Sequence, residues 1–283
     1  MPLKVKEFMT KDPISHVVPS PINEIVSILI KNNITGIPLR NQDGKYVGMV
    51  SRKDIFKNPE ETQLAMVMRK SEPVNENDSI EDAAKIIVSQ GHRHITVVND
   101  NNEIVGILTP QNFLSFVREK FGTIPVDRFS SKFVYPVWNK TPLPVFYHII
   151  QITSLYAFPV IDRDGKLIGI VTDRDIFDNI DLRTELIKSE TGMADDEDPW
   201  SWSGIRNVFS YFVQRNRISL PDIPLDDVTI KNPYYVVSDS PLSDAVEVML
   251  KGNYNQLPVL SGEGKLRSML YDIDILGVFL EDH

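Results

Sequence analysis

Four short segments of this chain place a hydroxyl and a carboxylate, or close substitutes for them, three residues apart. The pairs are Ser51 with Asp54, Thr109 with Asn112, Thr172 with Asp175, and Tyr271 with Asp274. Each pair follows an apolar strand pattern and opens a helix, where free backbone N–H groups attract anions. A hydroxyl can donate to a phosphate, and a carboxylate can accept from sugar hydroxyls. The segments are therefore candidates for binding a small anionic ligand.

The same residues also suit a purely structural role. Ser51 at the first position can cap a helix, and an acid such as Asp54 in the first turn is favoured by the helix dipole. Pro110 after Thr109 strengthens the capping interpretation there, because proline favours the first helical position. Capping and ligand binding both remain open on this evidence.

The four segments belong to a longer internal repeat. Ser51, Thr109, Thr172 and Tyr271 are separated by 58, 63 and 99 residues, so the last interval carries an insertion of about 40 residues. The spacing predicts four repeats and one inserted segment. The expected boundaries are 1–60, 61–120, 121–182, 183–224 for the insertion, and 225–283.

Each repeat has the same expected order of elements. A short proline-containing start precedes a helical pattern such as residues 79–88, which opens with a Ser-x-x-Asp capping signal. Two strands follow, for example 37–39 and 46–50, joined by turn residues 41–44. The second helix begins at the hydroxyl residue. One such α/β (α+β) unit is too small to bury its own sheet, so the repeats are expected to pair.

The composition excludes several classes of protein. The net charge of −9 argues against nucleic acid as a partner, and no apolar run reaches the length of a membrane span. The chain has no cysteine, which excludes disulfides and cysteine catalysis, and it starts without the apolar stretch of a signal peptide. These features favour a cytoplasmic location. The five histidines lack zinc-helix spacing and no catalytic motif is recognised, so neither an enzyme nor a metal site is expected.

The repeat resembles the CBS domain, a nucleotide-sensing module. The resemblance rests on the opening at 5–13 and on four central strands, at 34–39, 91–98, 155–160 and 254–259. It implies a β-α-β-β-α fold for each repeat and two pairs, or Bateman modules, covering residues 1–120 and 121–283. The pairs would form a flat pseudo-symmetric disc. At the level of architecture the chain also resembles the gamma subunits of AMP-activated protein kinase.

The resemblance implies roles for the hydroxyl and acidic residues. In CBS proteins the matching aspartate binds ribose, and the matching Ser or Thr lies near ribose or phosphate. Asp54 and Asp175 are therefore the main ribose candidates, together with Ser51 and Thr172. Thr109 and Asp274 are weaker candidates, because Asn112 lacks the charge of an aspartate and Tyr271 replaces the usual hydroxyl residue.

Phosphate groups would need local cations in a chain that is acidic as a whole. The candidates are Arg52, Lys53, Arg93, His94 and Arg174. Lys53 and Arg174 directly precede the ribose candidates, and Arg93 and His94 precede a strand expected to line the cleft shared with the first repeat. His94 is expected to be partly protonated near neutral pH, which would make phosphate binding depend on pH.

Adenine would need a flat apolar slot with a backbone edge. The candidates are Ile14, Gly36, Ile37 and Pro38 in the first repeat, and Val137, Ala157, Phe158 and Pro159 in the third. A place in the ordinary hydrophobic core is an equal alternative for each of them.

The insertion has features that the repeats do not explain. The second helix of the third repeat is expected to end near Lys188, and residues 205–213 have an amphipathic helical pattern. The acidic run 195–198 favours a solvated loop, with a metal or a basic partner as the alternative. Trp200 and Trp202 are expected to fasten the insertion to the body.

The favoured function is a non-enzymatic regulatory protein that binds AMP, ADP or ATP, without any other cofactor, and acts on an unknown effector protein. A binder of another adenosyl ligand, such as S-adenosylmethionine, is the first alternative. A ligand-free interaction scaffold is the second. A homodimer is compatible with the sequence, which does not decide the oligomeric state.

Overall fold

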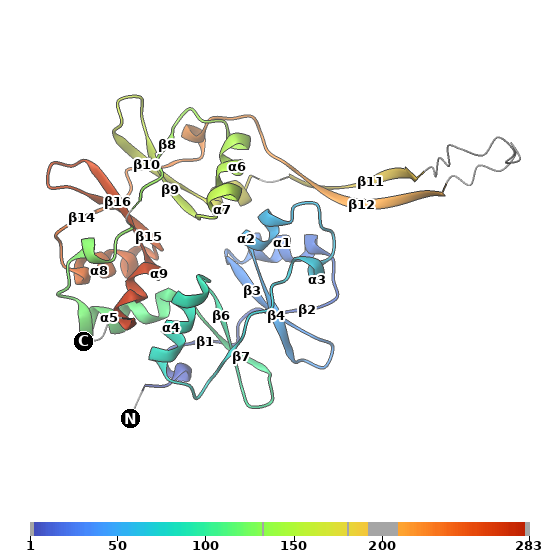
Figure 1. The fold of residues 1–283 in the computed structure, drawn as a ribbon, viewed down its shortest axis with the longest axis horizontal. Coiled ribbons are helices and arrows are strands. Elements are labelled where there is room, and N and C mark those ends of the chain that lie inside the picture. The colour runs from blue at the N-terminus through green and yellow to red at the C-terminus, as the bar shows by residue number, and fades with distance from the viewer. Residues whose placement is uncertain (1–2, 132, 180, 192–208, 281–283) are drawn as a thin grey trace, which may run out of the picture.

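The computed structural model describes residues 3–131, 133–179, 181–191 and 209–280, and it describes no side chains between 180 and 218. Four α/β repeats lie around a common centre in a flat disc, and a two-stranded arm extends from its rim (Figure 1). No helix in these ranges is long and apolar enough to cross a membrane.

The first two repeats contain two hairpins and five helices. In the first repeat the elements are β1 (Thr10–Lys11), β2 (His16–Val17), α1 (Ile22–Lys31), β3 (Gly36–Arg40), β4 (Tyr46–Ser51) and α2 (Arg52–Lys57). In the second they are α3 (Leu64–Val67), β5 (Val74–Asn75), α4 (Ile80–Gln90), β6 (Ile95–Val98), β7 (Ile104–Leu108) and α5 (Leu114–Phe121).

The last two repeats follow the same order and flank the arm. In the third the elements are β8 (Val137–Trp138), α6 (Leu143–Thr153), β9 (Ala157–Ile161), β10 (Leu167–Thr172) and α7 (Asp173–Phe177). The arm consists of β11 (Asp181–Thr191) and β12 (Phe209–Ser219). The fourth repeat contains β13 (Ile230–Lys231), β14 (Val236–Val237), α8 (Leu242–Gly252), β15 (Gln256–Leu260), β16 (Leu266–Tyr271) and α9 (Asp272–Ile275).

The local sequence explains these elements. Ser79 caps α4 by accepting a hydrogen bond from the backbone N–H of Asp82 at 3.1 Å, and Gly91 ends that helix in a left-handed conformation. In every repeat the strand before the long helix pairs in parallel with the strand after it, and the last two strands form an antiparallel hairpin. The parallel pairs are β2 with β3, β5 with β6, β8 with β9 and β14 with β15.

Opening segments cross between neighbouring repeats. Strand β1 of the first repeat pairs with β7 of the second, and β13 of the fourth repeat pairs with β10 of the third. The start of the second repeat crosses to the first, where Arg69 forms an antiparallel β-bridge with Met49 on β4. The start of the third repeat crosses to the fourth, where the backbone N–H of Ser131 donates to the carbonyl of Met269 on β16. Repeats one and two therefore form one module, and repeats three and four form the other.

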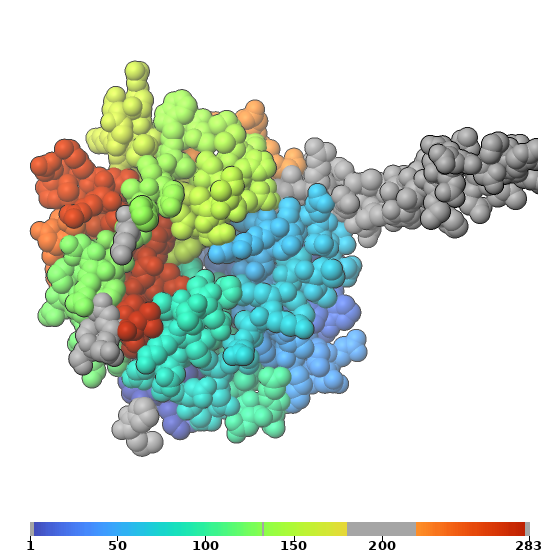
Figure 2. All heavy atoms as spheres, in the orientation of Figure 1, coloured from blue at the N-terminus to red at the C-terminus, as the bar shows by residue number. Residues whose placement is uncertain are grey.

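The hydrophobic cores join the two modules into the disc. One core combines buried residues of repeats one and three, including Phe56, Phe146 and Phe177. The other core combines repeats two and four, including Ile87, Phe113 and Met249. Figure 2 shows atoms of all four repeats meeting near the middle of the disc. Each repeat thus contacts one neighbour through its sheet and another through its helices.

The insertion differs from its predicted structure. Helix α7 ends at Phe177, not near Lys188, and residues 209–213 of the predicted helix lie in β12. The helical spacing of apolar residues was misleading, because β11 and β12 satisfy each other's backbone groups in register from Asp181↔Ser219 to Thr191↔Phe209. The acidic run 195–198 and both tryptophans fall outside the described residues.

Candidate functional site

The strand-to-helix junctions have the same local geometry in three of the repeats. Asp54 accepts hydrogen bonds from the Ser51 backbone N–H at 2.8 Å and from the Ser51 hydroxyl at 2.6 Å, both at Oδ2. Asp175 accepts the equivalent bonds from Thr172 at 2.7 and 2.8 Å. Asn112 accepts them from Thr109 at 2.8 and 3.0 Å. These contacts fix each helix start, as the capping interpretation anticipated.

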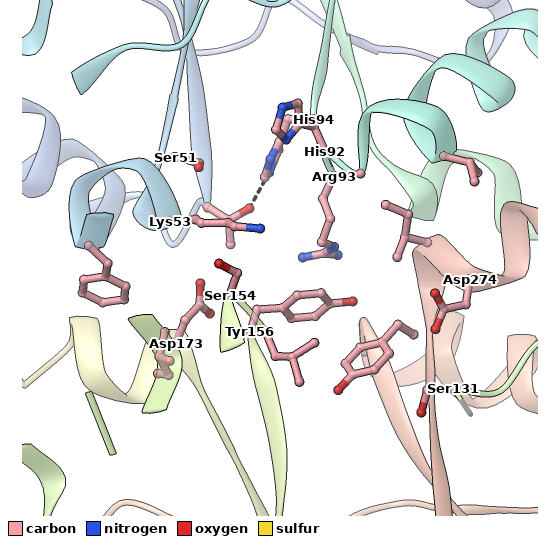
Figure 3. Close-up of a pocket in the computed structure, with 18 of the residues that line it drawn as sticks. Ser51, Lys53, His92, Arg93, His94, Ser131, Ser154, Tyr156, Asp173 and Asp274 are labelled. Carbon is pink, nitrogen blue, oxygen red and sulfur yellow. Dashed lines mark hydrogen bonds between the residues drawn. The ribbon is translucent and has the colours of Figure 1, made fainter. Parts of the chain in front are cut away.

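A cavity of about 620 Å³ lies where the four repeats meet. Its volume falls within the range of sites that hold small organic ligands. Figure 3 shows Ser51, Lys53 and Arg93 on the side of the first module, opposite Tyr156 and Asp274 on the side of the second. The cavity is therefore shared by both modules.

The first module gives its side of the cavity a positive charge. The basic residues that line it are Lys53, Lys57, Arg69, His92, Arg93 and His94. Burial, followed by the nearby positive charges of Lys57 and Arg69, lowers the pKa of Lys53. Burial and the charge of Arg69 likewise lower the pKa of His92. The charged side chains of Lys53, Lys57 and Arg69 lie close enough together to oppose one another's charge, which a bound anion would relieve.

The second module contributes hydroxyls, two carboxylates and the guanidinium of Arg128 to the opposite side. Ser130, Ser131, Ser154 and the aspartates Asp173 and Asp274 all line the cavity. Burial raises the pKa of Asp274 to about 7. Within the described residues, no ion pair holds this carboxylate, so it is available to accept hydrogen bonds from a ligand.

Two buried ion pairs cross from one module to the other beside the cavity. Arg93 donates to Asp272 from Nε at 3.2 Å and from Nη2 at 2.6 Å, and its guanidinium lies 4.5 Å from the centre of the Tyr156 ring. Arg52 lies 3.6 Å from Asp173 through Nη1 and Oδ1. Burial alone would lower the pKa of Arg93, but the ion pair with Asp272 raises it. Both arginines thus tie the modules together.

His94 is buried and uncharged at neutral pH. Burial, and then the positive charges of Arg93, Arg69 and Arg52, hold its pKa well below the usual range. Its Nε2 lies 2.5 Å from the hydroxyl of Thr35 in the first repeat. The expectation that His94 is partly protonated near neutrality is therefore wrong, because the site lacks the solvent that a charged imidazole needs.

The comparisons with known proteins agree with this architecture. The CBS domain matches residues 5–61, 64–119, 129–182 and 225–281. The chain belongs to the CBS domain family. The expected four CBS repeats, paired in two modules that form a disc, are confirmed.

A solved structure supports the likeness to gamma subunits at the level of the fold. Protein MJ1225 from Methanocaldococcus jannaschii, described as a candidate archaeal homologue of the gamma subunit of AMP-activated protein kinase, is 15% identical with a TM-score of 0.77. The match covers 98% of this chain and 100% of that one. The two proteins therefore share their overall fold.

Two curated relatives match over parts of the chain. A homoserine O-acetyltransferase from Methanosalsum zhilinae is 36% identical over 103 residues, which are 36% of this chain and 20% of that protein. The chloroplastic CBS domain-containing protein CBSX1 from Arabidopsis thaliana is 30% identical over 171 residues, which are 59% of this chain and 60% of that protein. This chain therefore spans less than two thirds of either relative's length.

The structure brings some of the predicted site residues of the CBS repeats to the cavity and leaves others elsewhere. Ser51, Lys53, Arg93, His94 and Asp274 line it. Arg52 is committed to Asp173, and the half-exposed Arg174 lies 3.4 Å from Asp178. Asp54, Thr109, Thr172 and Asp175 lie at the junctions described above and do not line this cavity.

The predicted adenine slot residues occupy three environments. Ile37, Val137 and Phe158 are buried in the core that joins repeats one and three, and Ala157 lies in a smaller core between the sheets of the second module. Gly36, Pro38 and Pro159 are buried strand residues, and Ile14 is 43% exposed. None of them lines the central cavity.

Sequence reasoning missed several residues of the cavity, notably Lys57, Arg69, His92, Tyr156 and Asp173. Arg69 stands in the proline-containing start of the second repeat, but the sequence does not show that this segment crosses to the neighbouring sheet. No group of three or more His, Cys, Asp or Glu residues suited to a metal occurs in the described part of the chain.

Proposed function

We propose that this chain is a non-enzymatic regulatory protein that binds an adenine nucleotide, AMP, ADP or ATP, with its phosphates in the central cavity. The observation that carries the proposal is the distribution of charge across that cavity. The first module presents Lys53, Lys57 and Arg69, while the second presents serine hydroxyls and Asp274, with Arg128 as its one arginine among the lining residues. This arrangement suits a ligand with an anionic end and a hydroxylated end.

The sugar is assigned to the second module. Asp274 has a partly buried carboxylate without an ion pair in the described structure, and it faces the cavity with Ser131 (Figure 3). Two ribose hydroxyls can donate to such a carboxylate once it is ionised. Asp175 stays a second ribose candidate at its own junction, outside this cavity. Its Oδ2 accepts the same two bonds as that of Asp54, and the described strand that crosses there brings Ile230 opposite Ile170, where the first junction has Arg69.

Regulation would follow from the shared walls of the cavity. A ligand that contacts both modules changes the free energy of their relative arrangement, and an effector protein that binds that arrangement then alters nucleotide affinity by the same factor. The effector remains to be found. The chain's resemblance to gamma subunits supports a regulatory role of this kind.

S-adenosylmethionine is the second candidate ligand. The carboxylates of Asp173 and Asp274 in the cavity would favour its positive sulfonium, and this ligand has no phosphate to engage the cations. The two candidates therefore depend on different charges in one cavity.

Calorimetric titration of the purified chain with ATP, ADP, AMP and S-adenosylmethionine tests the proposal. Lys53→Ala should weaken ATP by about 1.5–3 kcal/mol, the usual contribution of a charge-assisted hydrogen bond, and should affect S-adenosylmethionine little. Arg174→Ala is the matched control, because this half-exposed cation lies outside the cavity. The absence of binding by any nucleotide at millimolar concentration contradicts the proposal.

A further inference from the structure

The two-stranded arm is incomplete as a β-sheet. Strands β11 and β12 pair with each other along their whole length, from Asp181↔Ser219 to Thr191↔Phe209, and with no other described strand. Figure 1 shows this ribbon extending away from the disc. A two-stranded ribbon is marginally stable in water at best, and an open strand edge readily accepts a further strand. The arm is therefore a candidate surface for pairing with another chain.

Apolar residues are assigned to both faces of the ribbon. Successive residues of a strand alternate between its faces, so the register divides the residues of the arm into two sets. The apolar members are Leu182, Leu186, Phe212 and Ile218 on one face, and Ile187, Phe209, Tyr211 and Val213 on the other. A ribbon that leaves the disc has no second layer to cover either set, so a wider sheet would be more favourable.

The two edges of the ribbon differ in charge. Strand β11 has five charged residues among its eleven, which are Asp181, Arg183, Glu185, Lys188 and Glu190. Charged residues, lysine above all, protect an open edge from pairing. Strand β12 has two, Arg215 and Arg217, and its first five residues are uncharged and include three aromatic residues. Aromatic residues favour strands, so the β12 edge is the one suited to accept a partner.

Strand β12 is complementary to a second copy of itself. Antiparallel pairing about a two-fold axis at Val213 places Tyr211 opposite Arg215 of the second copy. It also places Phe209 opposite Arg217 of the second copy, and Val213 opposite its own copy. Each pair of an arginine with an aromatic residue occurs twice by symmetry, and an arginine is attracted to an aromatic ring.

Other registers of the same pairing are less favourable. An axis at Arg215 or Arg217 places that arginine opposite its own copy, and an axis at Asn216 places the two arginines opposite each other. Like charges directly opposite are destabilising. An axis at Phe212 or Gln214 retains one type of arginine–aromatic pair in place of two. The axis at Val213 therefore specifies the register.

We propose that the arm joins two copies of this chain into a dimer through antiparallel pairing of β12 with β12, centred on Val213. The product is a four-stranded sheet in the order β11-β12-β12-β11, with the charged β11 strands at its outer edges. Ser219 ends each β12 six residues from the axis, so the two copies of Ser219 are roughly 40 Å apart and the discs lie at opposite ends of the sheet. This surface lies outside the nucleotide cavity and does not depend on the proposed function.

Sedimentation equilibrium of the full chain without nucleotide is the first test. The wild type should be a dimer at tens of micromolar, and a variant with residues 182–218 replaced by a short Gly-Ser linker should be a monomer. An unchanged melting temperature of the linker variant establishes that its disc is intact. A monomeric wild type overturns the proposal. A linker variant that remains a dimer also overturns it, because the discs would then hold the two copies together.

Disulfide formation tests the register. The chain contains no cysteine, so one introduced cysteine can form a disulfide only with its own copy in a second chain. Val213→Cys lies at the axis, where facing Cβ atoms are about 4.5–5.5 Å apart, near the range of a disulfide. Ser210→Cys is the matched control, since pairing about Val213 separates it from its copy by roughly 20 Å. Mild oxidation should give at least about tenfold more covalent dimer with Val213→Cys. Equal yields overturn the register.

Two opposite charges at Tyr211 test its pairing with Arg215. Tyr211→Arg opposes two cations twice in each dimer, so the dissociation constant should rise about tenfold. Tyr211→Glu places a carboxylate opposite the same arginine, so the dissociation constant should be unchanged or lower. Within its own ribbon residue 211 is opposite the uncharged Ser189, so neither variant opposes a charge there. Equal weakening by both variants overturns the pairing.

Discussion

Arg93 of the second repeat and Asp272 of the fourth are joined by a two-pronged ion pair, with Asp272 fully buried. Tyr156 of the third repeat completes the cluster by donating from its hydroxyl to Asp272 at 3.3 Å. Three repeats therefore meet in one polar contact at the centre of the disc. Since the two charges come from different modules, this contact helps to specify how the modules are oriented.

Removing the cation of this pair should destabilise the protein strongly. Arg93→Met leaves the buried carboxylate of Asp272 without its counter-charge, so the free energy of unfolding should fall by about 3–5 kcal/mol in urea titrations. Arg174→Met is the control, because its ion pair with Asp178 is about half exposed and should contribute less than about 1 kcal/mol. Equal effects of the two substitutions would contradict a structural role for the buried pair.

Adenosine binding should depend on the ionisation of Asp274. Its pKa is raised to about 7 by burial, and only the ionised carboxylate can accept from both ribose hydroxyls. The affinity for adenosine should therefore rise about tenfold from pH 6 to pH 8 in calorimetric titrations. Adenosine is the suitable probe, because it has no phosphate that titrates in this range. Asp274→Asn should remove the pH dependence, and a flat wild-type profile contradicts the assignment.

Ionisation of Asp274 should also change the stability of the fold. Adenosine affinity should rise with pH, whereas the contribution of Asp274 to the free energy of unfolding should fall. Because the folded-state pKa of Asp274 lies above the value for an unfolded aspartate, the folded state holds the proton more tightly. Its stabilising contribution is complete below about pH 4 and is lost as the pH rises through about 7. Relative to the wild type, Asp274→Asn should therefore gain stability between pH 5 and pH 8, as measured by urea unfolding at both values.

The half-buried Thr35 and the buried Thr96 provide a test of the polar contact at His94. The Thr35 hydroxyl contacts His94 Nε2, so Thr35→Val should cost about 1–3 kcal/mol by leaving a buried ring nitrogen unpaired. The hydroxyl of Thr96 is buried without a hydrogen-bond partner in the described structure, so Thr96→Val should be neutral or slightly stabilising. Thermal or urea unfolding of both variants decides the point. An equal loss of stability in Thr96→Val and Thr35→Val would contradict a specific contribution from the contact between Thr35 and His94.

The arm should be dispensable for the disc. Strands β11 and β12 pair with each other and with no other described strand, and Figure 1 shows them extending away from the repeats. Replacing residues 182–218 by a short Gly-Ser linker should leave the melting temperature and nucleotide affinity nearly unchanged. A large loss of either quantity would mean that the arm supports the disc. If the variant still binds nucleotide but an effector protein no longer responds to it, the arm would instead be the contact site for that effector.

The sequence predicted the fold well because the relevant signals are local and repeated. The hydroxyl and acidic residues at 51–54 and 172–175, together with the hairpin turns, mark the same elements in each repeat. Four noisy patterns that agree are far more informative than one. The arm lacked this advantage. Its strands are defined by their pairing with each other across a gap in sequence, which a helical spacing of apolar residues does not reveal.

The candidate site was predicted only in part, since it is assembled from four distant regions. Lys53 and Asp274 could be proposed from their own motifs, but Arg69 reaches Asp54 through a crossing segment. Burial also gives some residues a different role from the one that their type had suggested. Arg52 is paired with Asp173, and His94 is uncharged within the protein. Side-chain partners of this kind depend on three-dimensional packing, so neither motif nor spacing could specify them.

The crossing of opening segments limits how this protein can be divided. A fragment that ends after β4 would lack the backbone partner that Arg69 provides for Met49, and it would carry a β1 strand without β7. Exposed strand edges of that kind readily pair with other chains. The smallest portion with complete sheets is consequently a pair of repeats, so deletion experiments and chimeric proteins that cut between the members of a pair should yield material prone to association.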